Sequence, residues 1–185
     1  MRIIRELAEY PAEKSAVAIG KFDGVHLGHQ ELIEILKDTA VKHGLTAAVF
    51  TLDPSPAVLF GIREEQLMSP EEKREAFRRL GVDILVEYPF DRERAAMKPE
   101  DFVRQILVNG MHAEEVVCGE DVSFGAGGTG DRELLTALGD RYGFHVTVID
   151  KVMADGAPIR STRIRQAIRE GHREEALRML GRDPG

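Results

Sequence analysis

The chain has 185 residues, 25 basic and 32 acidic side chains, a formal net charge of −7 and 43% hydrophobic residues. This length and apolar content are typical of one folded domain and argue against a disordered chain, and the negative charge argues against a general nucleic-acid-binding protein. One cysteine, Cys118, excludes an internal disulfide framework, and no apolar run approaches the ~20 residues that span a bilayer.

The start of the chain carries no signal-peptide pattern, so we expect a cytoplasmic protein without a membrane or nucleic-acid partner. Short apolar runs then alternate with longer helical patterns along the chain. The predicted strands are 16–20, 46–52, 84–86, 115–118 and 144–149. The predicted helices are 26–42, 70–81, 99–108, 131–142, 162–170 and 173–180. This alternation predicts an α/β fold with a mainly parallel sheet and flanking helices.

Two boundaries in this pattern carry specific signals. Ser69, Pro70 and Glu72 form a hydroxyl cap, a first-turn proline and a capping box at the start of one helix. Residues 119–130 hold five glycines without periodicity and predict a loop, which at this length is often functional.

The first candidate site is the segment Gly20–His29, which follows a predicted buried strand and opens a helix. A helix N-terminus offers free N–H groups and a positive dipole end, which suit an anion. His26 and His29 are three residues apart and share one helix face, while Gly28 lets a ligand approach the backbone. The imidazoles could donate hydrogen bonds to phosphate oxygens in phosphoryl transfer. The alternatives are two ordinary capping histidines or a metal pair, although no third ligand is evident.

The second candidate site is the string 159–165, where Ser161 or Thr162 could cap a helix and Arg165 lies about one turn further on. Hydroxyls, helix N–H groups and arginine together suit a polyphosphate, and the alternative is a capped surface helix. From residue 160 onward there are seven arginines against four acids, so we expect the positive charge of the site to be gathered here.

The two strings resemble the nucleotidyltransferases that carry an HxGH motif early and an ISSTxxR motif late. More closely, GKFDGVHLGHQ, FTLDPSP, YPFDRERAAMKPEDFV, VVCGEDVSFGAGGTGD and IRSTRIR are similar to the FAD synthetase module of bacterial bifunctional riboflavin kinase/FAD synthetases. The resemblance covers nearly the whole chain. It implies a Rossmann-like HUP nucleotidyltransferase fold that transfers the adenylyl group of ATP to FMN, with Mg²⁺, and gives FAD and pyrophosphate.

The resemblance also implies roles for individual residues. His26, His29 and Arg165 would be catalytic, and flavin would lie near Asp53, Pro54 and Phe124. The residues implied in ATP binding are Phe22, Gly24, His26, Gly28, His29, Asp121, Ser161, Thr162 and Arg165. Metal ligands are not assigned by the motifs.

Three positions depart from the family pattern. Ser55 stands where the DPHP string has histidine, Arg160 replaces the first serine of ISST, and residues 121–125 read DVSFG where NFRFG is usual. These departures leave open a related nucleotidyltransferase with another phosphorylated acceptor, or a catalytically weak flavin- or nucleotide-binding protein. We expect residues 1–185 to form one FAD synthetase domain without a riboflavin kinase domain, and a full-length chain of this kind would receive FMN from a separate kinase.

Overall fold

Six parallel strands form the sheet of the computed structural model, which describes residues 1–62 and 65–183. The strands are β1 (Arg2–Ile4), β2 (Ser15–Ile19), β3 (Thr46–Asp53), β4 (Ile84–Pro89), β5 (Ala113–Gly119) and β6 (His145–Ile149). Their order is β1-β4-β3-β2-β5-β6, and every neighbouring pair is parallel. The predicted α/β fold is confirmed. The short edge strand β1 was not predicted.

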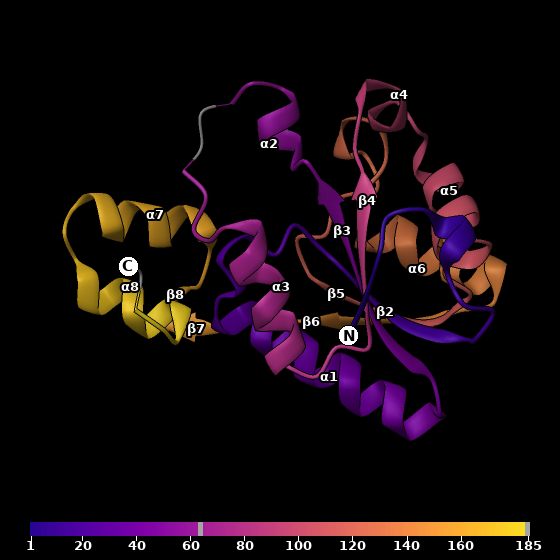
Figure 1. Cartoon of the computed structure of the whole chain (residues 1–185), viewed down its shortest axis with the longest axis horizontal. Helices are drawn as coiled ribbons and strands as arrows, with labels where there is room; N and C mark the ends of the chain where they lie inside the picture. The colour runs from indigo at the N-terminus through magenta and orange to yellow at the C-terminus, as the bar shows by residue number, and fades with distance from the viewer. Residues whose placement is uncertain (63–64, 184–185) are drawn as a thin grey trace.

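Helices cover both faces of the sheet (Figure 1). One face carries α1 (Leu27–His43) and α3 (Pro70–Arg79), and the other carries α6 (Arg132–Tyr142) and α5 (Pro99–Phe102) with the π-helix that continues it (Val103–Val108). The predicted helix 99–108 is therefore α-helical only in its first turn.

The central strands are buried on both faces because their successive apolar side chains point to opposite sides of the sheet. In β2, Ala16 and Ala18 pack with the α1 side, whereas Val17 and Ile19 pack with the side of α5 and α6. Every residue of β2 is buried, as expected of a parallel strand between two helical layers. Cys118 belongs to this core, and burial raises the pKa of its thiol to about 11.

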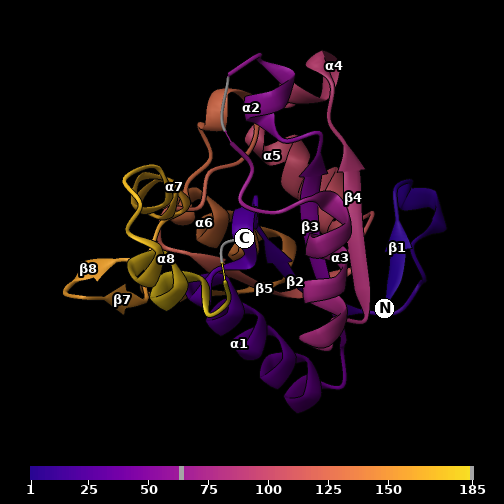
Figure 2. The ribbon, with the colours of Figure 1, turned by 60° about the vertical axis from the view of Figure 1, so that its left-hand side comes forward.

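The C-terminal helices form a separate unit beside the sheet (Figures 1 and 2). The hairpin β7 (Met153–Ala154) and β8 (Ala157–Pro158) is closed by a turn at Asp155 and Gly156 and leads into α7 (Ser161–Arg169) and α8 (Arg173–Leu180). Ile164, Met179 and Leu180 of these helices form a small buried cluster against which Leu27 of α1 packs. This contact joins the C-terminal helices to the start of α1.

Several short elements were not predicted. They are α2 (Pro56–Leu59), α4 (Arg92–Ala95) and the 3-10 turns Leu7–Glu9, Asp23–Val25 and Ala126–Gly128. By contrast, the capping box of α3 is confirmed: Ser69 Oγ accepts from Glu72 N–H at 3.2 Å, and Glu72 Oε2 accepts from Ser69 N–H at 2.7 Å. In the described part of the chain, no helix combines the length and apolar character needed to cross a bilayer.

Candidate functional site

A cavity of about 930 Å³ opens at the carboxyl ends of the central strands. The strand order reverses between β2 and β5, and ligands of open α/β sheets bind at such a reversal. The predicted site residues that line the cavity are Phe22, His26, Gly28, His29, Asp53, Pro54, Asp121, Phe124, Ser161, Thr162 and Arg165. The fold thus brings residues from opposite ends of the sequence into one cavity.

Gly24 does not line this cavity; it packs against Leu67 and Leu180. Its φ is +78°, and a Cβ there would lie 2.9 Å from Cβ of Leu67. Phe22 and Val25, on either side of it, also have positive φ angles of 51° and 40°, which are strained for residues with bulky side chains. The turn between β2 and α1 is therefore held in an unusual conformation by its surroundings, and Gly24 contributes to its shape.

His26 and His29 stack on one another at the start of α1. Their ring centroids are 3.6 Å apart and their planes differ by 13°. His26 is the N-cap of α1, and its Nδ1 accepts a hydrogen bond from the backbone N–H of His29 at 3.3 Å. A neutral His26 must therefore carry its proton on Nε2, which makes that atom a donor.

Burial keeps both imidazoles neutral. It lowers the pKa of His26 to about 4, and it lowers the pKa of His29 well below the usual 6.5, with further contributions from His26 and Lys73. Nδ1 of His29 is buried and has no hydrogen-bond partner among the described residues. A neutral, partly unsatisfied pair at a helix N-terminus gains most from an anionic ligand.

Gly28 fixes where the His26 ring can lie. A Cβ at this position would be 3.3 Å from both Cε1 and Nδ1 of His26. This is closer than side chains normally approach, so the absence of a side chain at Gly28 allows the imidazole to fold back over the helix start.

The start of α7 reaches the same turn through Asp23. Ser161 Oγ donates to the backbone carbonyl of Asp23 at 3.1 Å, and Nη1 of Arg165 pairs with Asp23 Oδ2 at 3.0 Å. The other carboxylate oxygen of Asp23 accepts from the backbone N–H of Leu67 at 3.1 Å. Asp23 therefore connects the two motif strings, and Arg165 is 7% exposed at the cavity wall.

Two expectations about this region are wrong. Ser161 and Thr162 do not cap α7, because Arg160 occupies the N-cap position without a side-chain hydrogen bond and Ser161 bonds to Asp23 instead. The C-terminal arginines do not gather at the site either: only Arg160 and Arg165 of the tail line the cavity. The others described mostly pair locally, as Arg163 does with Glu175 and Arg178 with Asp155, because carboxylates lie within reach.

The remaining positive groups of the cavity come from other elements. Lys21 follows β2, Lys73 lies on α3, Arg94 on α4 and Lys151 just after β6. Sequence reasoning missed these four residues and Asp23. Asp23 stands inside the first motif and could have been noticed there, whereas Lys73 and Arg94 carry no local signal of a site.

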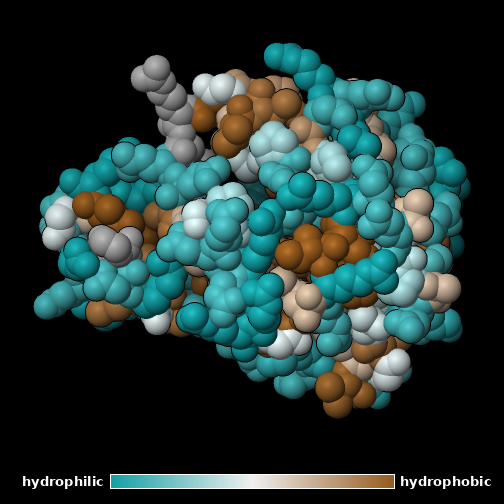
Figure 3. Space-filling model, in the orientation of Figure 1, coloured by the Kyte–Doolittle hydropathy of each residue, from teal (hydrophilic) through white to brown (hydrophobic). Residues whose placement is uncertain are grey.

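Apolar and aromatic side chains line the opposite end of the cavity. Phe124 packs on Phe102 with ring centroids 5.5 Å apart, and Phe50 lies 5.5 Å from Tyr88. Val58 and Phe60, at and just after α2, line the rim and are 49% and 53% exposed. Figure 3 shows hydrophobic side chains gathered over α2. This end of the cavity suits a flat, apolar ring system.

One of the positions that depart from the family pattern has a structural explanation. Ser55 is the N-cap of α2, and its Oγ accepts from the backbone N–H of Val58 at 3.4 Å. In the glycine-rich loop, a Cβ at Gly125 would lie 2.6 Å from Pro99, so the loop packs closely on α5. Asp121 in this loop lies at the cavity with Lys151 3.6 Å away.

A family model described as FAD synthetase matches residues 9–163. The chain belongs to the FAD synthetase family. This match spans the first motif string, the second as far as Arg163, and most of the cavity wall, so the fold is that of the HUP nucleotidyltransferases which the motifs resemble.

Two curated relatives of this FAD synthetase family member are longer than the chain. A bifunctional riboflavin kinase/FMN adenylyltransferase of Listeria monocytogenes is 42% identical over 176 residues, which cover 94% of this chain and 55% of that protein. The Escherichia coli K12 protein of the same name is 34% identical over 183 residues, which cover 98% of this chain and 58% of that protein. The chain thus spans a little over half the length of these relatives.

A solved structure from Streptococcus pneumoniae, described as a macrolide-efflux protein, matches with a TM-score of 0.84 and 29% sequence identity. The match covers 97% of this chain and 59% of that one.

Proposed function

We propose that the chain transfers the adenylyl group of ATP to FMN and releases FAD and pyrophosphate. The observation that carries this proposal is the stacked pair His26 and His29 at the N-terminus of α1, in one cavity with Ser161 and Arg165 of α7. The names of the relatives include FMN adenylyltransferase, in agreement with this activity.

The reaction is a direct displacement at phosphorus. A phosphate oxygen of FMN attacks the α-phosphorus of ATP, the new P–O bond forms, and the bond to the bridging oxygen of the β-phosphate breaks. Pyrophosphate leaves with that electron pair. Because the attacking oxygen is already anionic, no general base is required, and the protein accelerates the step by positioning and charge stabilisation.

Each end of the cavity has a part in this reaction. The β- and γ-phosphates lie against Ser161, Thr162 and Arg165, which supply hydroxyls, the start of α7 and a guanidinium. The α-phosphate lies at the imidazole pair, where the Nε2–H of His26 stabilises the charge that develops in the transition state. The isoalloxazine ring lies at the apolar end, near Asp53, Pro54 and Phe124.

Mg²⁺ enters this scheme bound to the phosphates of ATP. No group of three or more possible ligands lies together among residues 1–62 and 65–183, which fits a cation held by substrate phosphates and one carboxylate. Asp121 at the cavity is the carboxylate we assign, because its contact with Lys151 is 3.6 Å long and its side chain is exposed, whereas Asp23 is bound by Arg165 at 3.0 Å. When bound, the cation neutralises part of the polyphosphate charge.

The two substrates also indicate where the protein acts and which enzyme supplies its FMN. FMN comes from a riboflavin kinase activity, which the relatives' names place beside the adenylyltransferase. We assign the chain to the cytoplasm, where both substrates are made, and residues 1–185 to one domain.

Incubation of the protein with ATP, Mg²⁺ and FMN tests the proposal, with FAD and pyrophosphate separated by chromatography. We expect equimolar FAD and pyrophosphate. Turnover with a different phosphorylated acceptor but not with FMN would support a related nucleotidyltransferase instead, and nucleotide binding without any turnover would exclude an enzyme.

The His29→Ala variant tests the mechanism in the same assay. Removing one electrostatic stabiliser of a transition state lowers kcat by about 10²–10³-fold, and we expect a loss at least of this size. A thermal unfolding curve close to that of the wild type shows that the fold survives. Near-normal kcat in the folded variant would contradict the role of the pair.

A further inference from the structure

Lys73 is a cavity residue for which neither the motifs nor the family resemblance supplies a role. It lies in the first turns of α3, is half-buried, and its Nζ donates to the backbone carbonyl of Lys21 at 3.3 Å. Thr51 Oγ1 donates to the same carbonyl, also at 3.3 Å. The ammonium group is therefore held at the carboxyl end of β2, one residue before Phe22.

The ammonium of Lys73 also lies close to the imidazole pair. Its positive charge is one of the causes that lower the pKa of His29. The negative charges of Asp23, Glu87 and Asp53 act on it in the opposite sense and raise its own pKa. Lys73, Asp23 and Asp53 all line the same cavity.

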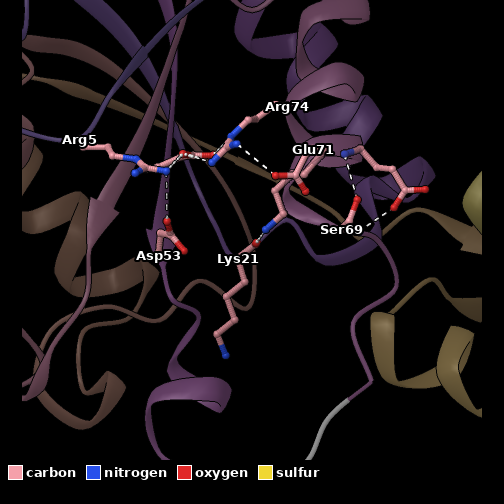
Figure 4. Close-up of polar contacts among 9 residues, drawn as sticks. Arg5, Lys21, Asp53, Ser69, Glu71 and Arg74 are labelled. Carbon is pink, nitrogen blue, oxygen red and sulfur yellow. Dashed lines mark hydrogen bonds and ion pairs between the residues drawn. The ribbon is translucent and has the colours of Figure 1, made fainter.

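These three carboxylates are already engaged by guanidinium groups. Glu87 accepts from Nε and Nη2 of Arg74 at 2.7 and 2.8 Å, and from Arg5 at 3.4 Å. Arg5 also lies 3.9 Å from Asp53, and Arg165 pairs with Asp23. Figure 4 shows the Arg5 and Arg74 guanidinium groups directed toward one another, with the Lys21 side chain pointing away from them.

Lys73 consequently has donor capacity left over. Within the described ranges, no carboxylate lies at ion-pair distance from its Nζ, and one of the three N–H donors of an ammonium goes to the Lys21 carbonyl. Burial lowers its pKa, as expected for a cation short of compensating charge. An anionic oxygen placed here would recover both the hydrogen bonds and the charge balance.

We propose that Lys73 binds the phosphate group of the acceptor and holds it beside the imidazole pair for attack on the α-phosphorus. This inference rests on the proposed function. The β- and γ-phosphates have Arg165 and the start of α7, whereas the acceptor phosphate must lie on the other side of the α-phosphate. Lys73 lines the same cavity as Arg165 and the aromatic side chains, and its ammonium is held at the carbonyl of Lys21. The next residue, Phe22, has its ring centroid 5.2 Å from that of His29, which fits an acceptor phosphate held near the imidazole pair. Lys73 would make the site select a phosphorylated flavin over a flavin without phosphate.

Flavin binding to the Lys73→Met variant tests this assignment, because methionine keeps the apolar stem and removes the charge. FMN and riboflavin share the ring system and differ in the phosphate, so both are titrated and followed by flavin fluorescence. We expect at least a tenfold loss of FMN affinity, the effect of losing a charged hydrogen bond, and an unchanged riboflavin affinity. The KM for FMN should rise more than the KM for ATP.

Lys42→Met is the matched control, since Lys42 is exposed near the end of α1 and its loss changes the net charge equally. It should bind FMN as the wild type does. Lys73→Gln serves as a second neutral variant if Lys73→Met does not fold. Equal losses of FMN and riboflavin affinity, or a rise confined to the KM for ATP, would overturn the assignment. Absence of FAD formation by the wild type would instead overturn the proposed function.

Discussion

His26 carries two tasks at the residue scale, since it caps α1 with Nδ1 and presents Nε2–H to the cavity. Both depend on a neutral ring. Burial lowers its folded-state pKa to about 4, whereas an unfolded chain has a histidine pKa near 6.5. The unfolded state therefore binds more protons between these values. The stability that depends on neutral His26 is fully present above pH 6.5 and is lost as the pH falls toward 4.

The pH dependence of unfolding tests this account of His26. Between pH 7 and pH 5, the free energy of unfolding should fall by about 2 kcal/mol more in the wild type than in His26→Asn, measured by urea denaturation. Asparagine can still cap the helix but does not titrate. If both proteins lose the same free energy over this interval, the ring is not held neutral by burial.

Gly28 offers a second test at the residue scale, because a side chain at this position should affect the catalytic rate more than the stability of the fold. Gly28→Ala places a Cβ 3.3 Å from Cε1 and Nδ1 of His26 and should displace the ring. We expect kcat to fall about tenfold to a hundredfold. Loss of the His26 cap and alanine's higher helix propensity should offset one another, so the unfolding temperature stays near that of the wild type. Unchanged kcat would mean that the ring position is not critical.

Single residues of the site differ in how far sequence alone could predict them. His26, Gly28 and His29 lie within four consecutive positions, so helix geometry predicts that the imidazoles meet. Lys73 reaches the cavity only because α3 crosses the face of the sheet near the end of β2, and no local pattern encodes that approach. Asp23 stands inside the first motif, but its role depends on a partner 142 positions away, which no local pattern predicts.

At the scale of elements, the site depends on the docking of α7 against the turn between β2 and α1. Asp23 provides two of the links, to Ser161 through its backbone and to Arg165 through its carboxylate. The cluster of Ile164 from α7, Met179 and Leu180 from α8 and Leu27 from α1 adds an apolar contact that also includes α8. The polyphosphate end of the cavity exists only when these elements are joined.

Asp23→Asn weakens this joint without changing side-chain size. The amide oxygen of the new side chain can still accept from the backbone N–H of Leu67, but the charge that holds Arg165 is lost. We expect a loss of about 2–3 kcal/mol in the free energy of unfolding and a rise in the KM for ATP. Asp38→Asn, an exposed site on α1, should show neither effect. A KM for ATP equal to that of the wild type would show that Arg165 does not need this partner.

Elements differ in how well their pattern predicts them. The helix from Ser69 and the buried strands were predicted because capping chemistry and apolar runs act locally. The edge strand β1 and the single-turn helices α2 and α4 are too short to show a period, and pairing with β4 alone makes residues 2–4 a strand. The cap of α7 was wrongly predicted because Ser161 finds a better partner in another element.

At the scale of the whole molecule, the order of the strands decides where chemistry can occur. The chain leaves β2 through α1, builds the sheet outward to β4, and returns to β5 on the other side of β2. The loops after β2 and β5 therefore diverge and leave a crevice, into which the glycine-rich loop and the imidazole pair both project. The alternation of strands and helices predicts this class of fold, whereas the reversal point becomes known only from the strand order.

The fate of each ATP phosphate tests the central claim, adenylyl transfer to FMN, most directly. ATP labelled at the α-phosphate should give labelled FAD with FMN and Mg²⁺, and ATP labelled at the γ-phosphate should give labelled pyrophosphate with unlabelled flavin. Label from the γ-phosphate in the flavin, or α-label confined to ADP or AMP, would contradict the account.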